Sequence, residues 1–169
     1  MNIVLIGYRG TGKTVVAEIL SDRLNMKKIG MDEEIVKKAG ISIPEIVEKY
    51  GWKKFRDIET ALAEQFSRLD GVILDTGGGV VERAENVEAL KKNGRVFWLK
   101  ASVDTIVKRI ESCTDRPALT PGASFTDEVS EVLEGRIPKY AGASHYEIDT
   151  DGITPVQVAD RISEIWNRG

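Results

Sequence analysis

The chain has 169 residues, of which 41% are hydrophobic and 30% are charged, and its formal net charge is −3. This length suits one domain with its own core, and the slightly negative charge argues against a protein that grips nucleic acid or an anionic membrane. One cysteine and one histidine exclude an internal disulfide and a zinc site built from those two residue types.

The N-terminal residues lack the pattern of a signal peptide, because the first apolar run is short, has no basic region before it and ends in glycines. No stretch approaches the ~20 consecutive apolar residues that a membrane-spanning helix needs. We therefore expect a cytoplasmic protein with no nucleic-acid or membrane partner. Nothing in the sequence demands a second chain, so we expect a monomer.

Short apolar runs recur along the chain and are separated by helical patterns. The runs at 2–7, 71–76 and 95–101 are nearly continuous, as in strands that are buried on both faces. The runs at 27–31 and 145–150 are weaker and are expected nearer an edge of the sheet. The alternation of strand and helix predicts an α/β fold with a parallel sheet covered on both sides.

Several helix ends are also recognisable. Ser42 and Glu45 have the spacing of a capping box at the start of a helix, and this helix is expected to end at Gly51. Thr154 and Pro155 are expected to begin the last helix, with the proline at the first helical position. Between these helices, a further apolar stripe consists of Trp52, Phe55, Ile58, Leu62 and Phe66.

The segment 7–14, GYRGTGKT, follows the first strand and opens into a helical pattern. It matches the phosphate-loop pattern G-x-x-x-x-G-K-[ST] in the strand–loop–helix context that this pattern requires. Its glycines let backbone N–H groups turn toward phosphate oxygens, and the helix adds its positive end. Lys13 would reach the β- and γ-phosphates, and the Thr14 hydroxyl would ligate Mg²⁺. The residues assigned to nucleotide binding are Gly10, Thr11, Gly12, Lys13, Thr14 and Val15.

A phosphate loop leaves two classes open, the kinases of small molecules and the switch GTPases or ATPases. The segment Asp75-Thr76-Gly77-Gly78 would pass as the D-x-x-G of a GTPase, but the guanine-reading Asn-Lys-x-Asp motif is absent, which favours an adenine nucleotide. Asp75 ends an apolar run, where such folds place a carboxylate for Mg²⁺ or its waters. The alternative is that Asp75 only begins the turn before Gly77.

Several spaced segments together resemble the shikimate kinase family, from Met1 to about Arg168. The more specific ones are Phe55-Arg56-x-x-Glu59, Gly77-Gly78-Gly79, Arg116-Pro117 and Arg136-x-Pro138-x-Tyr140. The resemblance implies an ATP-dependent, Mg²⁺-using kinase that phosphorylates the 3-hydroxyl of shikimate in aromatic amino-acid biosynthesis. It also implies a single P-loop kinase domain over 1–169, with a five-stranded parallel sheet flanked by helices, a helical substrate-binding segment at about 32–60 and a mobile lid at about 112–126.

The resemblance also implies roles for individual residues. Asp32 would contact the shikimate hydroxyls and help to deprotonate the attacking one, with Lys13 and Arg116 as the other catalytic residues. Arg116 would come from the lid onto the phosphates. Arg56 and Arg136 would hold the carboxylate, which suits the donor fork of a guanidinium. The remaining assignments are Gly77, Gly78 and Gly79 along the substrate, and Arg109 and Pro155 beside the adenine.

Each assignment has a simpler structural alternative. Asp32 could be only a helix N-cap, and Arg56 could be a surface residue that pairs with Glu59 one turn away. Arg136 could be solvated among polar neighbours. The three glycines from 77 to 79 could form an ordinary turn.

One departure from the family pattern concerns the metal. The family usually has Asp-x-Asp at the end of the second strand, where this chain has Gly30-Met31-Asp32. The missing first carboxylate is the one that helps to organise Mg²⁺ and its waters. We hypothesise that Asp75, at the tip of the neighbouring strand, supplies this charge.

Three further alternatives stay open at the level of sequence. A shifted alignment would make Asp32 the first acid and Glu34 the second, although the spacings from Lys13 and to Gly40 oppose it. Another small-molecule kinase, such as a gluconate or nucleoside monophosphate kinase, would share the architecture. A kinase-like protein that binds nucleotide without transferring phosphate belongs to a different functional class.

Overall fold

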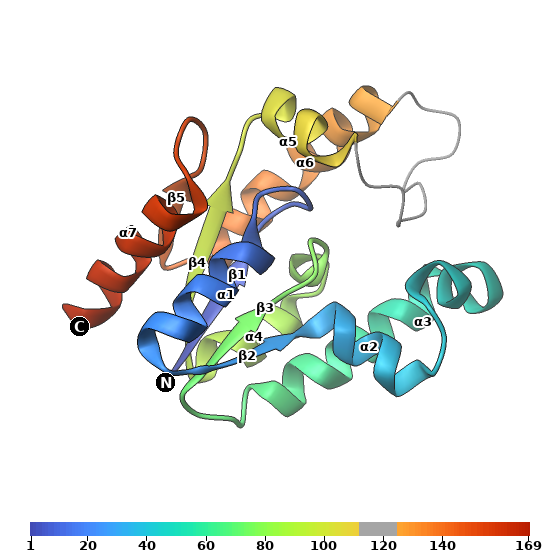
Figure 1. Ribbon diagram of the computed structural model, residues 1–169. Helices are drawn as coiled ribbons and strands as arrows, with labels where there is room; N and C mark the ends of the chain where they lie inside the picture. The colour runs from blue at the N-terminus through green and yellow to red at the C-terminus, as the bar shows by residue number, and fades with distance from the viewer. Residues whose placement is uncertain (112–124) are drawn as a thin grey trace.

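The computed structural model describes residues 1–111 and 125–169. At its centre lies a five-stranded sheet with the strand order β2-β3-β1-β4-β5, in which every pair of neighbours is parallel (Figure 1). The two weak apolar runs form the edges, as expected from their lower hydrophobicity. The strands are β1 (Asn2–Ile6), β2 (Lys27–Gly30), β3 (Val72–Asp75), β4 (Gly94–Lys100) and β5 (Tyr146–Asp149).

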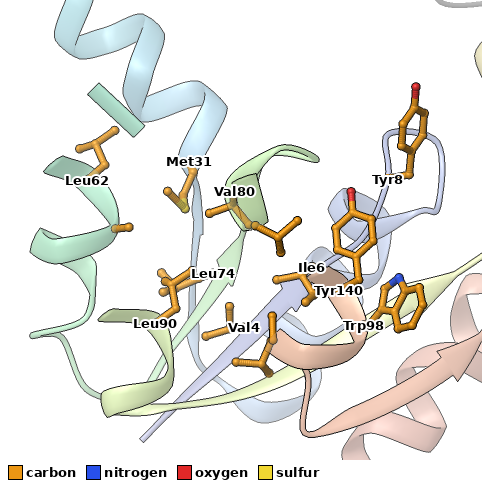
Figure 2. Close-up of a cluster of buried hydrophobic side chains, with 14 of the residues drawn as sticks. Val4, Ile6, Tyr8, Met31, Leu62, Leu74, Val80, Leu90, Trp98 and Tyr140 are labelled. Carbon is orange, nitrogen blue, oxygen red and sulfur yellow. The ribbon is translucent and has the colours of Figure 1, made fainter. Parts of the chain in front are cut away.

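Helices cover both faces of the sheet, which confirms the predicted fold class. Successive residues of β1 point to opposite faces, as the strand period requires. Ile3 and Leu5 pack under α1 (Lys13–Leu24) and α7 (Pro155–Asn167). Val4 and Ile6 belong to a larger core on the other face, which Figure 2 shows. The helices that contribute to this larger core include α3 (Ile43–Phe66), α4 (Ala84–Lys92) and α6 (Phe125–Ala143).

The helix that carries part of the site, α3, is bent. It starts with the predicted capping box, in which the Ser42 side chain accepts from the Glu45 N–H and the Glu45 carboxylate accepts from the Ser42 N–H at 2.8 Å. Gly51 has φ 79° and ψ 168°, so the helical geometry is interrupted at the residue expected to end the first helix. This left-handed φ favours glycine, and it lets the halves of α3 run in different directions (Figure 1).

The remaining helices are α2 (Met31–Ala39), the short 3₁₀-helix η1 (Val80–Glu82) and α5 (Val103–Ile110). The last helix, α7, starts as predicted, with Thr154 as N-cap, Pro155 in the first turn and Gln157 completing a capping box. Among the helices of residues 1–111 and 125–169, none has both the length and the apolar character required to cross a membrane.

Candidate active site

The site lies at the carboxyl edge of the sheet, where β1, β2 and β3 end side by side. In the register of these strands, Asp75 of β3 pairs with Leu5 of β1 on one side and with Gly30 of β2 on the other. The loop after β1 therefore lies beside the ends of β2 and β3. In open α/β sheets this edge, outside the carboxyl ends of the strands, is where ligands bind.

The loop after β1 has the geometry of an anion-binding loop. Gly10 and Gly12 have φ values of 81° and 90°, a backbone conformation that residues with a side chain rarely adopt. Gly12 is the N-cap of α1 and provides no side-chain cap, so the first N–H groups of the helix remain for a ligand. The Lys13 ammonium donates to the carbonyls of Gly7 at 2.8 Å and Tyr8 at 3.0 Å, which holds this cation across the loop.

Two adjoining cavities meet at Arg9 and Asp32, which line both of them. We call the first the loop cavity; it has a volume of about 390 Å³, in the range of small-molecule sites, roughly 300–1,000 Å³. We call the second, smaller one the arginine cavity. Besides Arg9 and Asp32, the loop cavity is lined by Gly10, Gly12, Lys13, Thr14, Val15, Gly30, Glu33, Asp75, Thr76, Arg109 and Ile110. The arginine cavity is also lined by Ile43, Trp52, Phe55, Arg56, Glu59, Gly77, Gly78, Gly79 and Arg136.

Arg56 is fixed in the wall of the arginine cavity. Its Nη1 donates to Oε2 of Glu59 at 2.8 Å, and the two side chains are only 15% and 1% exposed. The guanidinium carbon also lies 5.0 Å from the ring centre of Phe55 and 5.6 Å from that of Trp52. The predicted pair with Glu59 therefore exists, but it is buried at a cavity rather than solvated at the surface.

Arg136 approaches the same cavity from α6. Its side chain is 8% exposed, which contradicts the alternative of a solvated arginine, and its Nε donates to Glu82 of η1 at 2.6 Å. Its Nη1 lies 3.7 Å from the point where a Cβ at Gly78 would stand. The Tyr140 hydroxyl donates to the Gly78 carbonyl, so the glycine segment is attached to α6 close to Arg136.

The glycines at 77 to 79 are required by space rather than by backbone conformation, since none has a positive φ. A Cβ at Gly77 would stand 2.9 Å from Oδ1 of Asp32 and 3.1 Å from Oε1 of Glu59. A Cβ at Gly79 would overlap the guanidinium of Arg56. A turn is also present, because Val80 N–H donates to the Gly77 carbonyl at 3.2 Å. The segment therefore turns and also lets charged groups approach its backbone closely.

Asp32 lies at the junction of the cavities, and its charge acts on Glu59 in the arginine cavity and on Asp75 in the loop cavity. Asp32 stands in the first turn of α2, whose N-cap is Gly30, so the alternative that Asp32 is the cap is wrong. Burial raises the pKa of Glu59, although the charge of Arg56 opposes this shift. Burial also raises the pKa of Asp75, opposed by the charge of Lys13 and by the Thr14 hydroxyl, which donates to Oδ2 of Asp75 at 2.6 Å.

The other predicted residues have different positions. Arg109 lines the loop cavity and donates to the Gly10 carbonyl and the Thr150 hydroxyl, each at 3.2 Å. Thr11 is buried and donates to the Tyr8 carbonyl rather than lining the cavity. Pro155 begins α7 and is not among the lining residues of either cavity. Arg116 and residues 112–124 of the predicted lid lie outside the described residues.

Sequence reasoning missed Arg9, which lines both cavities. Its Nη2 donates to Glu128 of α6 at 3.0 Å, with side chains that are 14% and 5% exposed. Its guanidinium carbon lies 5.8 Å from the ring centre of Phe125. The only signal in the sequence is a cation at an unassigned position of the phosphate-loop pattern. Sequence reasoning also missed Glu33, which lines the loop cavity. It interpreted Trp52, which lines the arginine cavity, only as a packing residue.

The family model described as shikimate kinase matches residues 9–166. A shikimate kinase of Thermodesulfovibrio yellowstonii is 40% identical over 167 residues, which cover 99% of this chain and 95% of that protein. One of Caldicellulosiruptor bescii is 38% identical over 164 residues, covering 97% and 94%. The solved structure of a shikimate kinase from Acinetobacter baumannii in complex with shikimate superposes with a TM-score of 0.93 at 32% identity, covering 99% of this chain and 93% of that one.

Proposed function

The chain belongs to the shikimate kinase family, and we propose that it transfers the γ-phosphate of ATP to the 3-hydroxyl of shikimate, giving shikimate 3-phosphate and ADP. The observation that carries this proposal is the junction of the two cavities at Arg9 and Asp32. One cavity contains a phosphate loop, and the other is lined by three largely buried arginines, Arg9, Arg56 and Arg136. A phosphate donor and an anionic acceptor would therefore meet at these two residues.

The arginine cavity suits a small hydroxylated carboxylic acid. Arg56 and Arg136 present guanidinium groups, which match a carboxylate with two parallel hydrogen bonds. Asp32 stands at the boundary with the loop cavity, where the hydroxyl that attacks the phosphate would lie. As the base that accepts the proton of this hydroxyl, Asp32 would contribute roughly 10²–10⁴-fold to the rate.

The loop cavity suits the phosphates of ATP. The N–H groups at the start of α1 and the ammonium of Lys13 provide donors and positive charge for the β- and γ-phosphates. Arg109 and Pro155 are proposed to flank the adenine, and Arg116 to approach the phosphates. Phosphoryl transfer depends on alignment of the reactants and on neutralisation of charge on the phosphates. Arg9, at the boundary of the two cavities, would supply a further positive charge to the phosphoryl group as it is transferred.

The residues at the loop also fit a Mg²⁺ ion. The Thr14 hydroxyl and the Asp75 carboxylate are oxygen donors that already lie 2.6 Å apart. Within the described residues no group of three or more histidine, cysteine or acidic side chains is placed to hold a metal. Mg²⁺ is usually held by one or two carboxylates together with substrate phosphates. When bound, Mg²⁺ neutralises charge on the phosphates.

The rival functions make different demands on the arginine cavity. A gluconate or nucleoside monophosphate kinase would share the loop cavity, but Arg56 and Arg136 close to Asp32 favour a small carboxylate over a nucleobase. A protein without phosphotransfer activity would not require Lys13, Asp32 and the arginines to be arranged around one junction. We further propose that the protein is cytoplasmic and monomeric.

The test is a coupled ADP-release assay with ATP and Mg²⁺, with and without shikimate, followed by mass spectrometry of the product. The proposal predicts ADP release that depends on shikimate and an equal amount of shikimate 3-phosphate. ATP binding without shikimate-dependent turnover would refute it. Gluconate and nucleoside monophosphates in the same assay test the rival substrates.

A further inference from the structure

Gly30 stands at the end of β2, beside Asp75 in the sheet and in the wall of the loop cavity. Its φ of −88° and ψ of 116° are open to any residue, so the backbone does not require glycine here. A Cβ at this position would stand 2.9 Å from Cδ of Glu33, and 3.1 and 3.2 Å from its two carboxylate oxygens. The carboxylate of Glu33 therefore occupies the space that a side chain at residue 30 would take.

The position of Glu33 has a simple local cause. Glu33 is the third residue of α2, whose N-cap is Gly30. A glutamate at this place in a helix folds back over the N-cap, and the helix N-terminus favours negative charge there. Because Gly30 has no side chain, the carboxylate can lie against its Cα. It then lines the loop cavity together with Asp32 and Asp75.

We propose that Glu33, from α2, supplies a carboxylate in addition to that of Asp75 and so takes the place of the one that Gly30 cannot supply from β2. In this role it accepts hydrogen bonds from the waters of the Mg²⁺ ion that Thr14 and Asp75 would hold with the nucleotide. Mg²⁺ loses its waters reluctantly, so a carboxylate beside the site acts through them. The inference rests on the proposed function, because it concerns the metal of that reaction.

The competing explanation is that Glu33 only pairs with Lys28. The Lys28 ammonium lies 3.6 Å from Oε1 of Glu33 and 3.1 Å from Oε1 of Glu18. Lys28 thus has its closer contact with Glu18, which is not among the lining residues of the loop cavity. Replacing Glu18 removes the closer carboxylate contact of Lys28 without changing a residue that lines the cavity, and it is therefore the matched control for replacing Glu33.

The experiment measures Mn²⁺ binding to the intact protein in the presence of saturating ADP, by electron paramagnetic resonance of the free ion. Glu33→Gln keeps the shape of the side chain and is expected to raise the Kd for Mn²⁺ by about tenfold, a typical loss for an outer-shell ligand. Glu18→Gln is expected to leave the Kd for Mn²⁺ unchanged. An equal increase in the Kd for Mn²⁺ in both variants, or an unchanged Kd in Glu33→Gln, would overturn the proposal.

A second variant tests whether a carboxylate at residue 30 can replace the carboxylate of Glu33. Aspartate at residue 30 conflicts with Glu33 where that side chain now stands, but it fits if the glutamate is shortened or removed. Gly30→Asp combined with Glu33→Ala is therefore expected to bind Mn²⁺ more tightly than Glu33→Ala alone. If the double variant is no better than Glu33→Ala, residue 30 and Glu33 do not serve the same ion. Because the readout is metal binding, these outcomes differ from a failure of the proposed function, which would appear as a parent protein without shikimate-dependent turnover.

Discussion

Gly79→Ala tests whether the position of Arg56 controls binding of the substrate carboxylate. Gly79 has φ −98° and ψ 10°, which alanine tolerates, so the substitution does not strain the backbone. The added methyl group would overlap the guanidinium of Arg56. The long arginine side chain is the part that can move, and we expect it to leave the wall of the arginine cavity.

The expected magnitude follows from the contacts that Arg56 loses. A hydrogen bond between charged groups contributes about 1.5–3 kcal/mol, so losing one or two to the substrate carboxylate costs roughly 2–4 kcal/mol. This corresponds to an increase of roughly 30- to 1,000-fold in the KM for shikimate. The KM for ATP is expected to stay within about twofold, because Gly79 does not line the loop cavity.

The displaced arginine would also leave Glu59 buried without its ion pair. Burial already raises the pKa of Glu59, and the charge of Arg56 opposes that shift. Without Arg56 the pKa of Glu59 in the folded protein rises further above its value in the unfolded chain. At pH values between these two pKa values, the folded protein keeps a proton on Glu59 that the unfolded chain has released. Stability therefore falls as pH rises, and the difference in Tm between Gly79→Ala and the parent is expected to grow with pH.

The assay is steady-state kinetics with both substrates varied, together with Tm at several pH values. Gly142→Ala is the matched control, since a Cβ there meets nothing within 4 Å and the residue lies in α6. Arg56→Ala completes a double-mutant cycle with Gly79→Ala. If the two substitutions raise the KM for shikimate additively, or if Gly79→Ala leaves it unchanged, the reasoning about Arg56 is wrong.

Three further predictions concern the cations and carboxylates of the site. Asp75→Asn is expected to raise the Mg²⁺ concentration for half-maximal turnover, and an unchanged requirement would exclude Asp75 from metal binding. Arg9→Ala is expected to lower kcat by about 10²-fold with little change in the KM for ATP, as measured in the same assay, since it removes charge from the phosphate in transfer. Burial alone would raise the pKa of Glu82, but hydrogen bonds from Lys139 and Arg136 hold it below its usual value of 4.5. The ionised Glu82 carboxylate therefore stabilises the fold above pH 4.5, and this stabilisation is lost at lower pH. Glu82→Gln is therefore expected to lower Tm near neutral pH and to lose this effect in acid; a Tm deficit that is independent of pH would contradict it.

Local patterns were sufficient to predict the sheet and the phosphate loop. The continuous apolar runs marked the inner strands, and the weak runs at 27–31 and 145–150 formed the edges. Asp75 was expected at a strand tip beside the second strand, and the register places it next to Gly30. These predictions succeed because strand burial and loop geometry are set by residues that are adjacent in sequence.

The partners of the arginines could not be predicted in the same way. Arg136 bonds Glu82 and Arg9 bonds Glu128, and each pair joins segments that are far apart in the chain. No periodicity connects such residues, because their meeting depends on how helices pack on the sheet. Arg56 and Glu59 are the exception, since they are three residues apart on one helix, although the sequence did not indicate that this pair is buried.

These three ion pairs have a common consequence for binding. A buried arginine without a partner costs several kcal/mol, so the empty site must supply a carboxylate to each one. The pairs use different atoms: Nη1 of Arg56, Nε of Arg136 and Nη2 of Arg9. Each of these hydrogen bonds helps to hold its guanidinium in orientation while the group still lines a cavity. A ligand that meets groups already in position loses less of its binding energy to ordering them, and this ordering of the arginines is what the carboxylates contribute to the binding of an anion.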